Sequence, residues 1–330
     1  MSRISTLQRA MLLLAAILTT SIYSLLPGLA AAATSAAPNP GQGLQLSPPV
    51  ISAQANPGQS VTLNIKLRNV SGGTLIINGT ANDFTAEGEN GQPQISLNQT
   101  TPTRFSLRQW VGAIPSVSLT SQEQRVFPVQ IFVPKNAEPG GHYAVIRFTG
   151  TPLDLKASGV ALSASIGALI LFTVNGAATH QLSTIDMRTQ DSKGQTRSFF
   201  DGGPITILER IKDKGNVHED PTGSIVVTDM FGKVTATLPF NDKKGNILPD
   251  SIRKFTQTLN QKPLFGHYTV TGNITYAGGT KLTLPATSFW VIPFKLLLGI
   301  VIALILLFLF FRVGIKRYNT RIIARSRRRS

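Results

Sequence analysis

One long apolar run near the C-terminus constrains the whole chain. Residues 289–311 read FWVIPFKLLLGIVIALILLFLFF, with a single lysine near the outer end. A helix of this length reaches about 34 Å, which is enough to cross a hydrocarbon core of about 30 Å. The sequence therefore predicts a transmembrane helix over residues 288–312, followed by a basic tail at 313–330.

The residues that flank this run predict its orientation. Arg312, Lys316 and Arg317 begin a series of basic residues that contains no acid. Dense positive charge resists translocation, so we expect a cytoplasmic C-terminus. The tail would then lie on anionic lipid of the inner leaflet, or serve only as a topology signal. Trp290 and Lys295 lie near the outer end, where an amphipathic ring and a long ammonium side chain suit the membrane interface.

The N-terminus agrees with this orientation. Two arginines precede an apolar stretch, and Ala31-Ala32-Ala33 fits the small-residue rule for signal peptidase. The sequence predicts a signal peptide over residues 1–33; an uncleaved anchor is the alternative and leaves the same topology. We therefore expect a single-pass plasma-membrane protein whose bulk is extracellular.

Composition limits the chemistry of the exterior segment. The chain has no cysteine, so its stability depends on an ordinary apolar core. The formal net charge of +16 comes largely from the two terminal segments. The remaining exterior segment is only mildly basic, and we expect no nucleic-acid partner.

Hydrophobic periodicity indicates the fold class. Residues 61–67, VTLNIKL, alternate apolar and polar positions, which is typical of a half-buried strand. Similar short runs follow, separated by Gly, Pro and Asn, and no helical periodicity is sustained between residues 44 and 285. After a flexible lead-in at 34–43, the sequence predicts an all-β chain with two tandem immunoglobulin-like β-sandwiches, 44–177 and 178–287, followed by one C-terminal transmembrane helix.

An internal repeat supports two sandwiches. Gly141-His142-Tyr143 recurs as Gly266-His267-Tyr268, and a proline-containing turn precedes each copy. The tyrosines are either corner residues that hold a crossing loop or core residues with a satisfied hydroxyl. The equivalent positions of the two histidines favour a structural role.

No motif for catalysis is present. The four histidines have no metal-ligand spacing, and no G-x-S-x-G sequence occurs. We therefore expect no enzyme activity, no catalytic residue, no metal and no cofactor. Residues 284–288, LPATS, resemble a sortase signal except for the final serine; the alternative is the last strand of the second sandwich.

One segment resembles a known family. Residues 105–148 contain Trp110, then Val133-Pro134, Ala137, Pro139-Gly140 and an aromatic strand, and residues 163–176 read SASIGALILFTVNG. This pattern, mainly within 44–177, resembles the N-terminal domain of the WxL-interacting proteins of Gram-positive cell surfaces. The resemblance implies a membrane-anchored protein whose first domain binds peptidoglycan and whose second binds a partner surface protein.

Two functions follow as hypotheses. In the first, a cell-envelope binding protein recognises wall polymer or a partner surface protein through Trp110, Arg104 and Arg108. An indole stacks on sugar, and guanidinium groups pair with carboxylates or phosphates. The alternative for these residues is a core tryptophan beside solvated arginines. In the second hypothesis, the chain is an assembly chaperone or surface-fibre partner that acts by edge-strand pairing.

Overall fold

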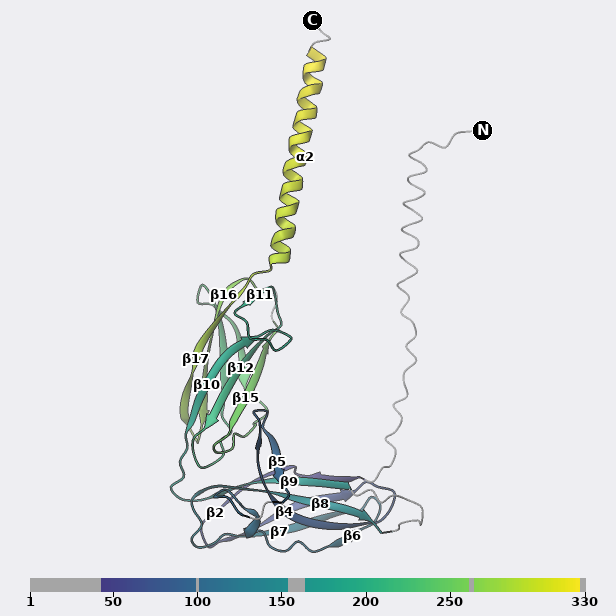
Figure 1. Ribbon diagram of the computed structural model, residues 1–330, viewed down its shortest axis with the longest axis vertical. Helices are drawn as coiled ribbons and strands as arrows, with labels where there is room; N and C mark the ends of the chain where they lie inside the picture. Colours follow the sequence, from purple (N-terminus) through teal and green to yellow (C-terminus); the bar gives the residue numbers. More distant parts are fainter. Residues whose placement is uncertain (1–42, 99–100, 154–163, 261–263, 327–330) are drawn as a thin grey trace, which may run out of the picture. The chain divides into compact units, whose positions relative to one another are not determined.

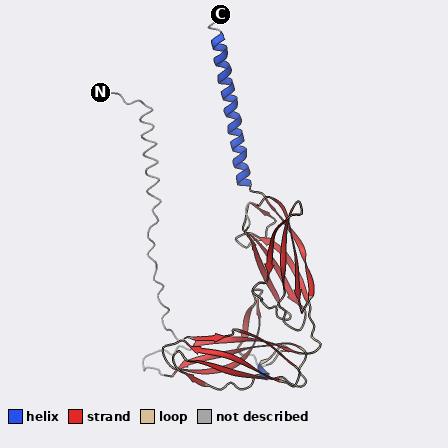
Figure 2. Cartoon of the chain, turned by 180° about the vertical axis from the view of Figure 1, so that it is seen from behind, coloured by secondary structure: helices blue, strands red, loops and turns tan. Residues whose placement is uncertain are grey.

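The computed structural model describes residues 43–98, 101–153, 164–260 and 264–326. The predicted signal peptide, and the lead-in up to residue 42, lie outside these residues. Within them, the predicted fold class is confirmed: strands build two β-sandwiches, and one long helix follows (Figures 1 and 2).

The strands and helices are named in chain order. The first sandwich holds a short 3₁₀ helix, η2 (Arg108–Trp110), and the strands β1 (Leu44–Ser47), β2 (Val50–Ala55), β3 (Ser60–Asn69), β4 (Leu75–Glu87), β5 (Gln92–Ser96), β6 (Val117–Leu119), β7 (Gln124–Phe132), β8 (Gly140–Pro152) and β9 (Ala164–Val174). The second holds β10 (Leu182–Gln190), β11 (Phe199–Phe200), β12 (Ile205–Asp213), β13 (Thr222–Asp229), β14 (Val234–Phe240), β15 (Ile252–Leu259), β16 (Gly266–Tyr276) and β17 (Thr280–Val291); the helix α2 (Phe294–Ser326) ends the series.

The first sandwich packs a small sheet on a larger one. The small sheet has the order β1-β3-β7, and the larger has the order β2-β9-β8-β4-β5, with β6 also paired to β4. Strand β3 shows why the sequence folds this way, because Leu63, Ile65 and Leu67 are buried while the residues between them are exposed. Phe127 and Phe148 meet across the core at 5.1 Å between ring centroids.

The second sandwich repeats this plan. The sheet β10-β12-β15 packs on the sheet β11-β17-β16-β13-β14, and a single apolar cluster fills the space between them. The repeated Gly-His-Tyr segments begin β8 and β16, as the internal repeat predicts. Tyr268 behaves as a corner residue, since its hydroxyl donates to the Phe265 carbonyl at 3.2 Å and accepts from the Phe265 amide at 3.1 Å.

The last strand and the helix join almost directly. Residues 288–291 belong to β17, so the predicted start of the transmembrane helix at 288 is wrong by six residues. Phe289 and Val291 are fully buried in the second core, and Trp290 pairs with His267 on β16. Sandwich packing therefore holds these apolar residues as strand, and α2 begins at Phe294.

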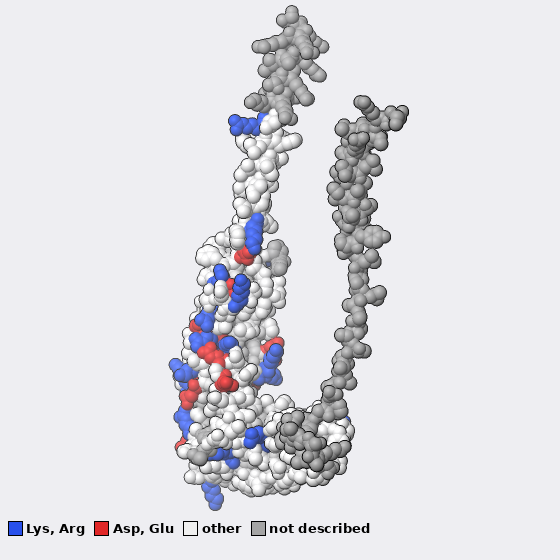
Figure 3. Space-filling view, turned by 45° about the vertical axis from the view of Figure 1, so that its right-hand side comes forward, with Lys and Arg blue, Asp and Glu red and all other residues white. Residues whose placement is uncertain are grey.

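The apolar part of α2 is long enough to span a bilayer. Phe294–Val313 comprises 20 residues, none of them buried, which corresponds to about 30 Å of helix. Between Lys295 and Arg312 the helix surface carries no charged side chain (Figure 3). The helix continues to Ser326, so most of the predicted tail is helical.

The sortase-like residues Leu284–Ser288 lie inside β17. Leu284 is buried and pairs with Gly272 on β16, and Thr287 pairs with Val270. The register shifts between these two pairs, which leaves Pro285 in a β-bulge where its missing N–H is tolerated. The segment is therefore the last strand of the second sandwich.

A carboxyl group lies inside the second core. Glu209 is fully buried on the inward face of β12, between Ile207 and Ile211. Burial raises the pKa of Glu209 to about 9, because a charged carboxylate is poorly solvated there. The side-chain amide of Gln257 on β15 lies against this acid, with one amide atom 2.6 and 3.0 Å from the two carboxyl oxygens. Burial therefore favours the protonated form of Glu209, whose hydroxyl can donate to the amide oxygen of Gln257.

Replacement of Glu209 by glutamine should flatten the pH dependence of stability. The folded protein keeps the Glu209 proton above the unfolded pKa of 4.5 and up to about 9, so stability falls as pH rises through this window. The slope is up to about 1.4 kcal/mol per pH unit. Urea unfolding of the full chain in detergent, between about pH 7.5 and 9, isolates Glu209 because Asp213, with a pKa of about 7, is already ionised.

The matched control for this measurement is Glu87→Gln at an exposed position of β4. This variant should keep the slope of the parent protein, whereas Glu209→Gln should lose it. An unchanged slope in Glu209→Gln would show that Glu209 is ionised in the fold.

Candidate functional site

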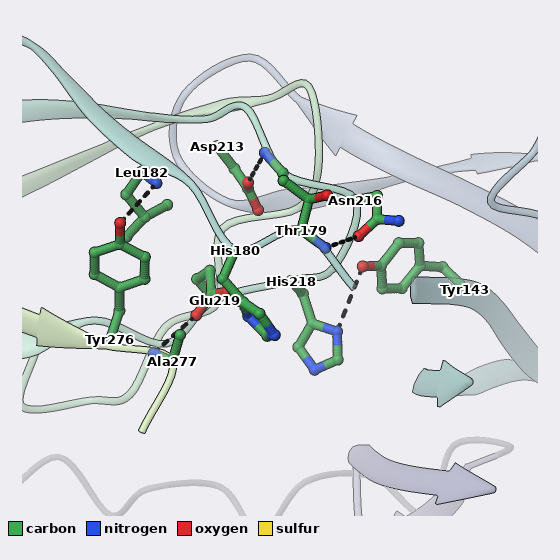
Figure 4. Close-up of polar contacts among 11 residues, drawn as sticks. Tyr143, Thr179, His180, Leu182, Asp213, Asn216, His218, Glu219, Tyr276 and Ala277 are labelled. Atoms are coloured by element: carbon green, nitrogen blue, oxygen red, sulfur yellow. Dashed lines mark hydrogen bonds and ion pairs between the residues drawn. The ribbon is translucent and has the colours of Figure 1, made fainter. Parts of the chain in front are cut away.

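The two sandwiches meet through loops and the ends of strands. The Gly141 amide donates to the Asn216 carbonyl at 2.7 Å, and the Asn216 side-chain amide donates to the Pro139 carbonyl at 2.9 Å. The Tyr143 hydroxyl lies 3.4 Å from His218 Nδ1 (Figure 4). The start of β8 is thus tied to the loop that follows β12.

This close approach requires glycine at position 140. Gly140 has a φ of +129°, and a Cβ built there would lie 2.7 Å from the Asn216 carbonyl oxygen. A side chain would therefore both strain the backbone and push the two loops apart. The close approach to Asn216 therefore explains why the turn at Pro139-Gly140 needs a glycine.

The second sandwich supplies a polar cluster at the junction. Glu219 accepts from the Ala277 amide at 3.2 Å and lies 2.6 Å from His180 Nδ1 (Figure 4). Burial lowers the pKa of His218 to about 4 and raises that of Asp213 to about 7. His218 and Glu219 turn to different partners, so these neighbours do not converge on one point.

The turn between β4 and β5 forms hydrogen bonds with the second sandwich. The Glu89 carboxylate accepts from the Arg210 guanidinium in a bidentate pair, with one bond of 2.8 Å. The Glu89 carbonyl also accepts from the Lys254 amide at 2.8 Å. The hydrogen bond from Arg210 is the main reason that the pKa of Glu89 lies below its usual value. One residue thus contacts both β12 and β15.

A cavity of about 470 Å³ lies beside this turn. Phe84, Phe105 and Tyr143 line it from the first sandwich, and Leu248 lines it from the second. The same side chains belong to a small apolar cluster separate from the two main cores. The structure therefore places an aromatic-lined hollow where the sandwiches meet.

An ion pair lies at the cavity wall. Arg104 donates to Asp250 at 2.6 Å, and the Arg104 guanidinium lies 4.4 Å from the centre of the Phe105 ring. Both partners of the ion pair are more than half exposed, so the pair stabilises the junction by about 1 kcal/mol at most.

The structure brings together only part of the predicted ligand patch. Arg104 and Trp110 line a second, smaller cavity of about 270 Å³ together with His142. Trp110 is half-buried and lies 4.3 Å from the His142 ring. Arg108 instead turns inward, where its Nε lies 3.0 Å from the buried Asp83 carboxylate. Arg108 therefore takes part in an ion pair that joins η2 to β4, and its role in ligand binding stays a prediction.

The predicted membrane-interface residues occupy different elements. Trp290 is the last residue but one of β17, is 41 % exposed, and packs on His267 at 4.9 Å between ring centroids. Lys295 lies in the first turn of α2, 3.2 Å from Asp201. Arg312 is exposed near the other end of the apolar segment. The side chains of Lys316 and Arg317 lie outside the described part of the structure.

Sequence reasoning missed the residues that build the larger cavity. The turn at 88–91, GENG, is recognisable as a hairpin connection, but nothing in its spacing names Arg210 as the partner of Glu89. Leu248 lies in a loop without periodicity. The contact of Glu89 with Arg210, and that of Leu248 with the aromatic cluster of the first sandwich, each join residues more than a hundred positions apart.

Comparisons with known proteins yield structural likenesses only. No family model and no curated protein matches the chain. The fimbrial chaperone CfaA aligns with 76 % of this chain and all of its own, at 12 % identity and a TM-score of 0.36. The Escherichia coli chaperone DraB covers 76 % of this chain and 97 % of its own, at 12 % identity and a TM-score of 0.35. Likenesses of this degree carry no argument about ligands.

Loss of the Glu89 charge should loosen the junction locally. In Glu89→Gln the bidentate ion pair with Arg210 is lost, while the backbone bond to Lys254 can still form. A partly exposed pair contributes about 1 kcal/mol or less, so exchange of the Lys254 amide should quicken by up to about fivefold. The exchange rate of the Lys254 amide is measured on the full chain by hydrogen–deuterium exchange and mass spectrometry.

The control is Glu123→Gln, which removes an exposed pair with Arg125 within the first sandwich. That change should leave exchange at Lys254 as it is in the parent. Equal exchange in Glu89→Gln and the parent would mean that the turn does not hold β15.

Proposed function

We propose that this chain is a single-pass protein of a bacterial cell envelope, and that its exterior sandwiches bind a partner surface protein. The apolar segment of α2 anchors it in the plasma membrane, and the basic residues beyond it keep the C-terminus in the cytoplasm. Its role is binding, not catalysis. A family relationship to the WxL-interacting proteins remains part of this proposal.

The cavity between the sandwiches carries the proposal. Its lining of aromatic and aliphatic side chains, with Arg104 and Asp250 at the wall, suits an apolar side chain flanked by polar backbone. Protein interfaces concentrate their affinity in such pockets, where an inserted side chain is fully desolvated. A polysaccharide would leave many of its own hydroxyl groups without hydrogen-bond partners against the aromatic and aliphatic part of this lining.

Edge-strand pairing has less support from the strands themselves. The outer edge of β7 is identified by Gln130, whose carbonyl accepts from the Gly112 amide. Backbone groups alternate along a strand, so Pro128 also faces outward and supplies no N–H there. Edge strand β14 likewise contains Pro239. We therefore place the partner in the cavity and not on β7.

Leu248→Gln should weaken binding of the partner by about tenfold or more, because an unpaired amide buried in the contact costs about 1–3 kcal/mol. The partner is first captured by cross-linking from native envelopes. Its affinity for the purified full chain is then measured by titration in detergent.

Leu153→Gln is the control, since Leu153 is exposed beyond the far end of β8. It should bind the partner as the parent does. If both variants bind equally, or if no protein is captured, the cavity is not the docking site.

Wall polymer is the second candidate, favoured by the smaller cavity. There the half-buried Trp110 and the exposed Arg104 lie together, as sugar stacking and anion pairing require. Trp110→Ala combined with Arg104→Gln should lower sedimentation with isolated walls by about threefold to tenfold. Arg104→Gln alone guards against a folding defect at Trp110, and Arg125→Gln is the control for charge. Equal sedimentation of all variants would exclude this site for polymer.

A further inference from the structure

One end of the second sandwich lies next to the membrane if α2 spans it, as the proposed function holds. Strand β17 ends at Val291 and α2 begins at Phe294, so only Ile292 and Pro293 separate them. Two residues reach about 7 Å at most. The bilayer surface must therefore lie against this end, whatever the tilt of the helix.

The strand register shows which loops share this end. On one side of β17, Phe199 pairs with Trp290; on the other, Gly266 pairs with Val291. One strand further, Asp229 pairs with Tyr268. The segments around Phe199, the β13–β14 turn and the start of β16 therefore surround the point where the chain leaves for α2. Figure 1 shows β11 and β16 beside the start of α2.

Exposed apolar side chains concentrate at this end. Phe231 is 86 % exposed, Phe199 65 % and Phe265 61 %. Among the described residues of the second sandwich, the exposed large hydrophobic residues apart from Ile185, which lies in mid-β10, are all here: Phe199, Met230, Phe231, Val234, Phe265, Trp290 and Ile292. The described residues at the opposite end, which faces the first sandwich, include no exposed large hydrophobic side chain. We call this set the membrane foot.

Ordered backbone holds these side chains outward. In the β13–β14 turn, the Asp229 carboxylate accepts from the amides of Phe231 and Lys233, both at 2.9 Å. The Phe265 backbone is fixed by the Tyr268 hydroxyl. Such anchored turns would normally carry polar residues in water, yet both of these present phenylalanine.

The surroundings of the foot match a lipid interface. A cavity of about 500 Å³ beside the start of α2 is lined by charged residues on one part, where Arg197 pairs with Asp191 and where Lys193 and Asp201 also lie, and by Phe199, Ile292 and Phe294 on another. Lys193 and Lys233 are exposed. Cations at headgroup level next to aromatic rings are the pattern of side chains at a bilayer surface.

We infer that the membrane foot inserts into the outer leaflet of the bilayer that α2 crosses. The aromatic rings enter the boundary between headgroups and acyl chains, to a depth of roughly 5–10 Å. The sandwich is then held at the bilayer by several separate loops as well as by α2. The position of the exterior cavities above the membrane follows from this second attachment.

The test uses tryptophan as a depth probe in the full chain. Trp110→Phe and Trp290→Phe remove both native tryptophans. Phe231→Trp or Phe265→Trp then adds one reporter, and Thr280→Trp, exposed in the β16–β17 turn at the opposite end, is the control. The proteins are placed in phosphatidylcholine–phosphatidylglycerol vesicles, with or without lipids that carry a nitroxide near the headgroup end of the acyl chain.

Flotation with the vesicles is measured first, and circular dichroism checks the fold. We expect the nitroxide lipid to quench about half or more of the fluorescence at 231 and 265, and little at 280, because quenching needs contact at the depth given above. A floating protein with quenching no greater at 231 and 265 than at 280 would overturn the foot and leave the membrane anchor standing.

Two other outcomes also decide the matter. If the protein does not float with the vesicles, both the membrane anchor and the membrane foot are refuted. Unquenched but blue-shifted reporters at 231 and 265, in a protein that cross-links to itself, assign this end to a second copy of the chain and refute the lipid contact.

Discussion

The pairing of β17 with β16 is the interaction on which the rest of the structure depends. The ladder runs from Tyr276 and Thr280 to Gly266 and Val291, and it buries Phe289 in the second core. Because the ladder continues almost to the helix, no flexible linker separates sandwich from α2. The same residues therefore complete a β-sandwich and lead the chain into α2, and this continuity defines which end of the sandwich lies beside the apolar helix.

A second constraint acts where the sandwiches meet. The turn at Glu89 contacts Arg210 and the Lys254 amide, while Gly140 allows the loop at Asn216 to approach closely. These contacts are polar and local, and they leave hollows beside them. A hollow of about 470 Å³ at the junction is lined in part by Leu248, which neither sandwich buries completely. The proposed binding site is thus a region of incomplete packing between two well-packed units.

Much of the fold follows from local pattern. Alternation in β3, the repeated Gly-His-Tyr segments and the absence of helical periodicity predict two sandwiches because inward and outward positions alternate strictly in strands. The predicted start of the transmembrane helix was wrong for a related reason. Phe289 and Val291 are as apolar as the residues of α2, and hydropathy does not distinguish a buried strand from a membrane helix. The ligand patch stays a prediction, and the sequence did not indicate that Arg108 pairs with the buried Asp83, because the two residues are 25 positions apart in the chain.

The sequence by itself determined the all-β class, the repeat and the apolar C-terminal helix, because each depends on residues close together in the chain. Only the tertiary structure decided that Glu209 lies in a core, that Glu89 meets Arg210, and that exposed phenylalanines gather beside the start of α2. The physical reason is common to all three. Strand register brings together residues far apart in the chain, and burial or exposure is set by those neighbours and not by residue type.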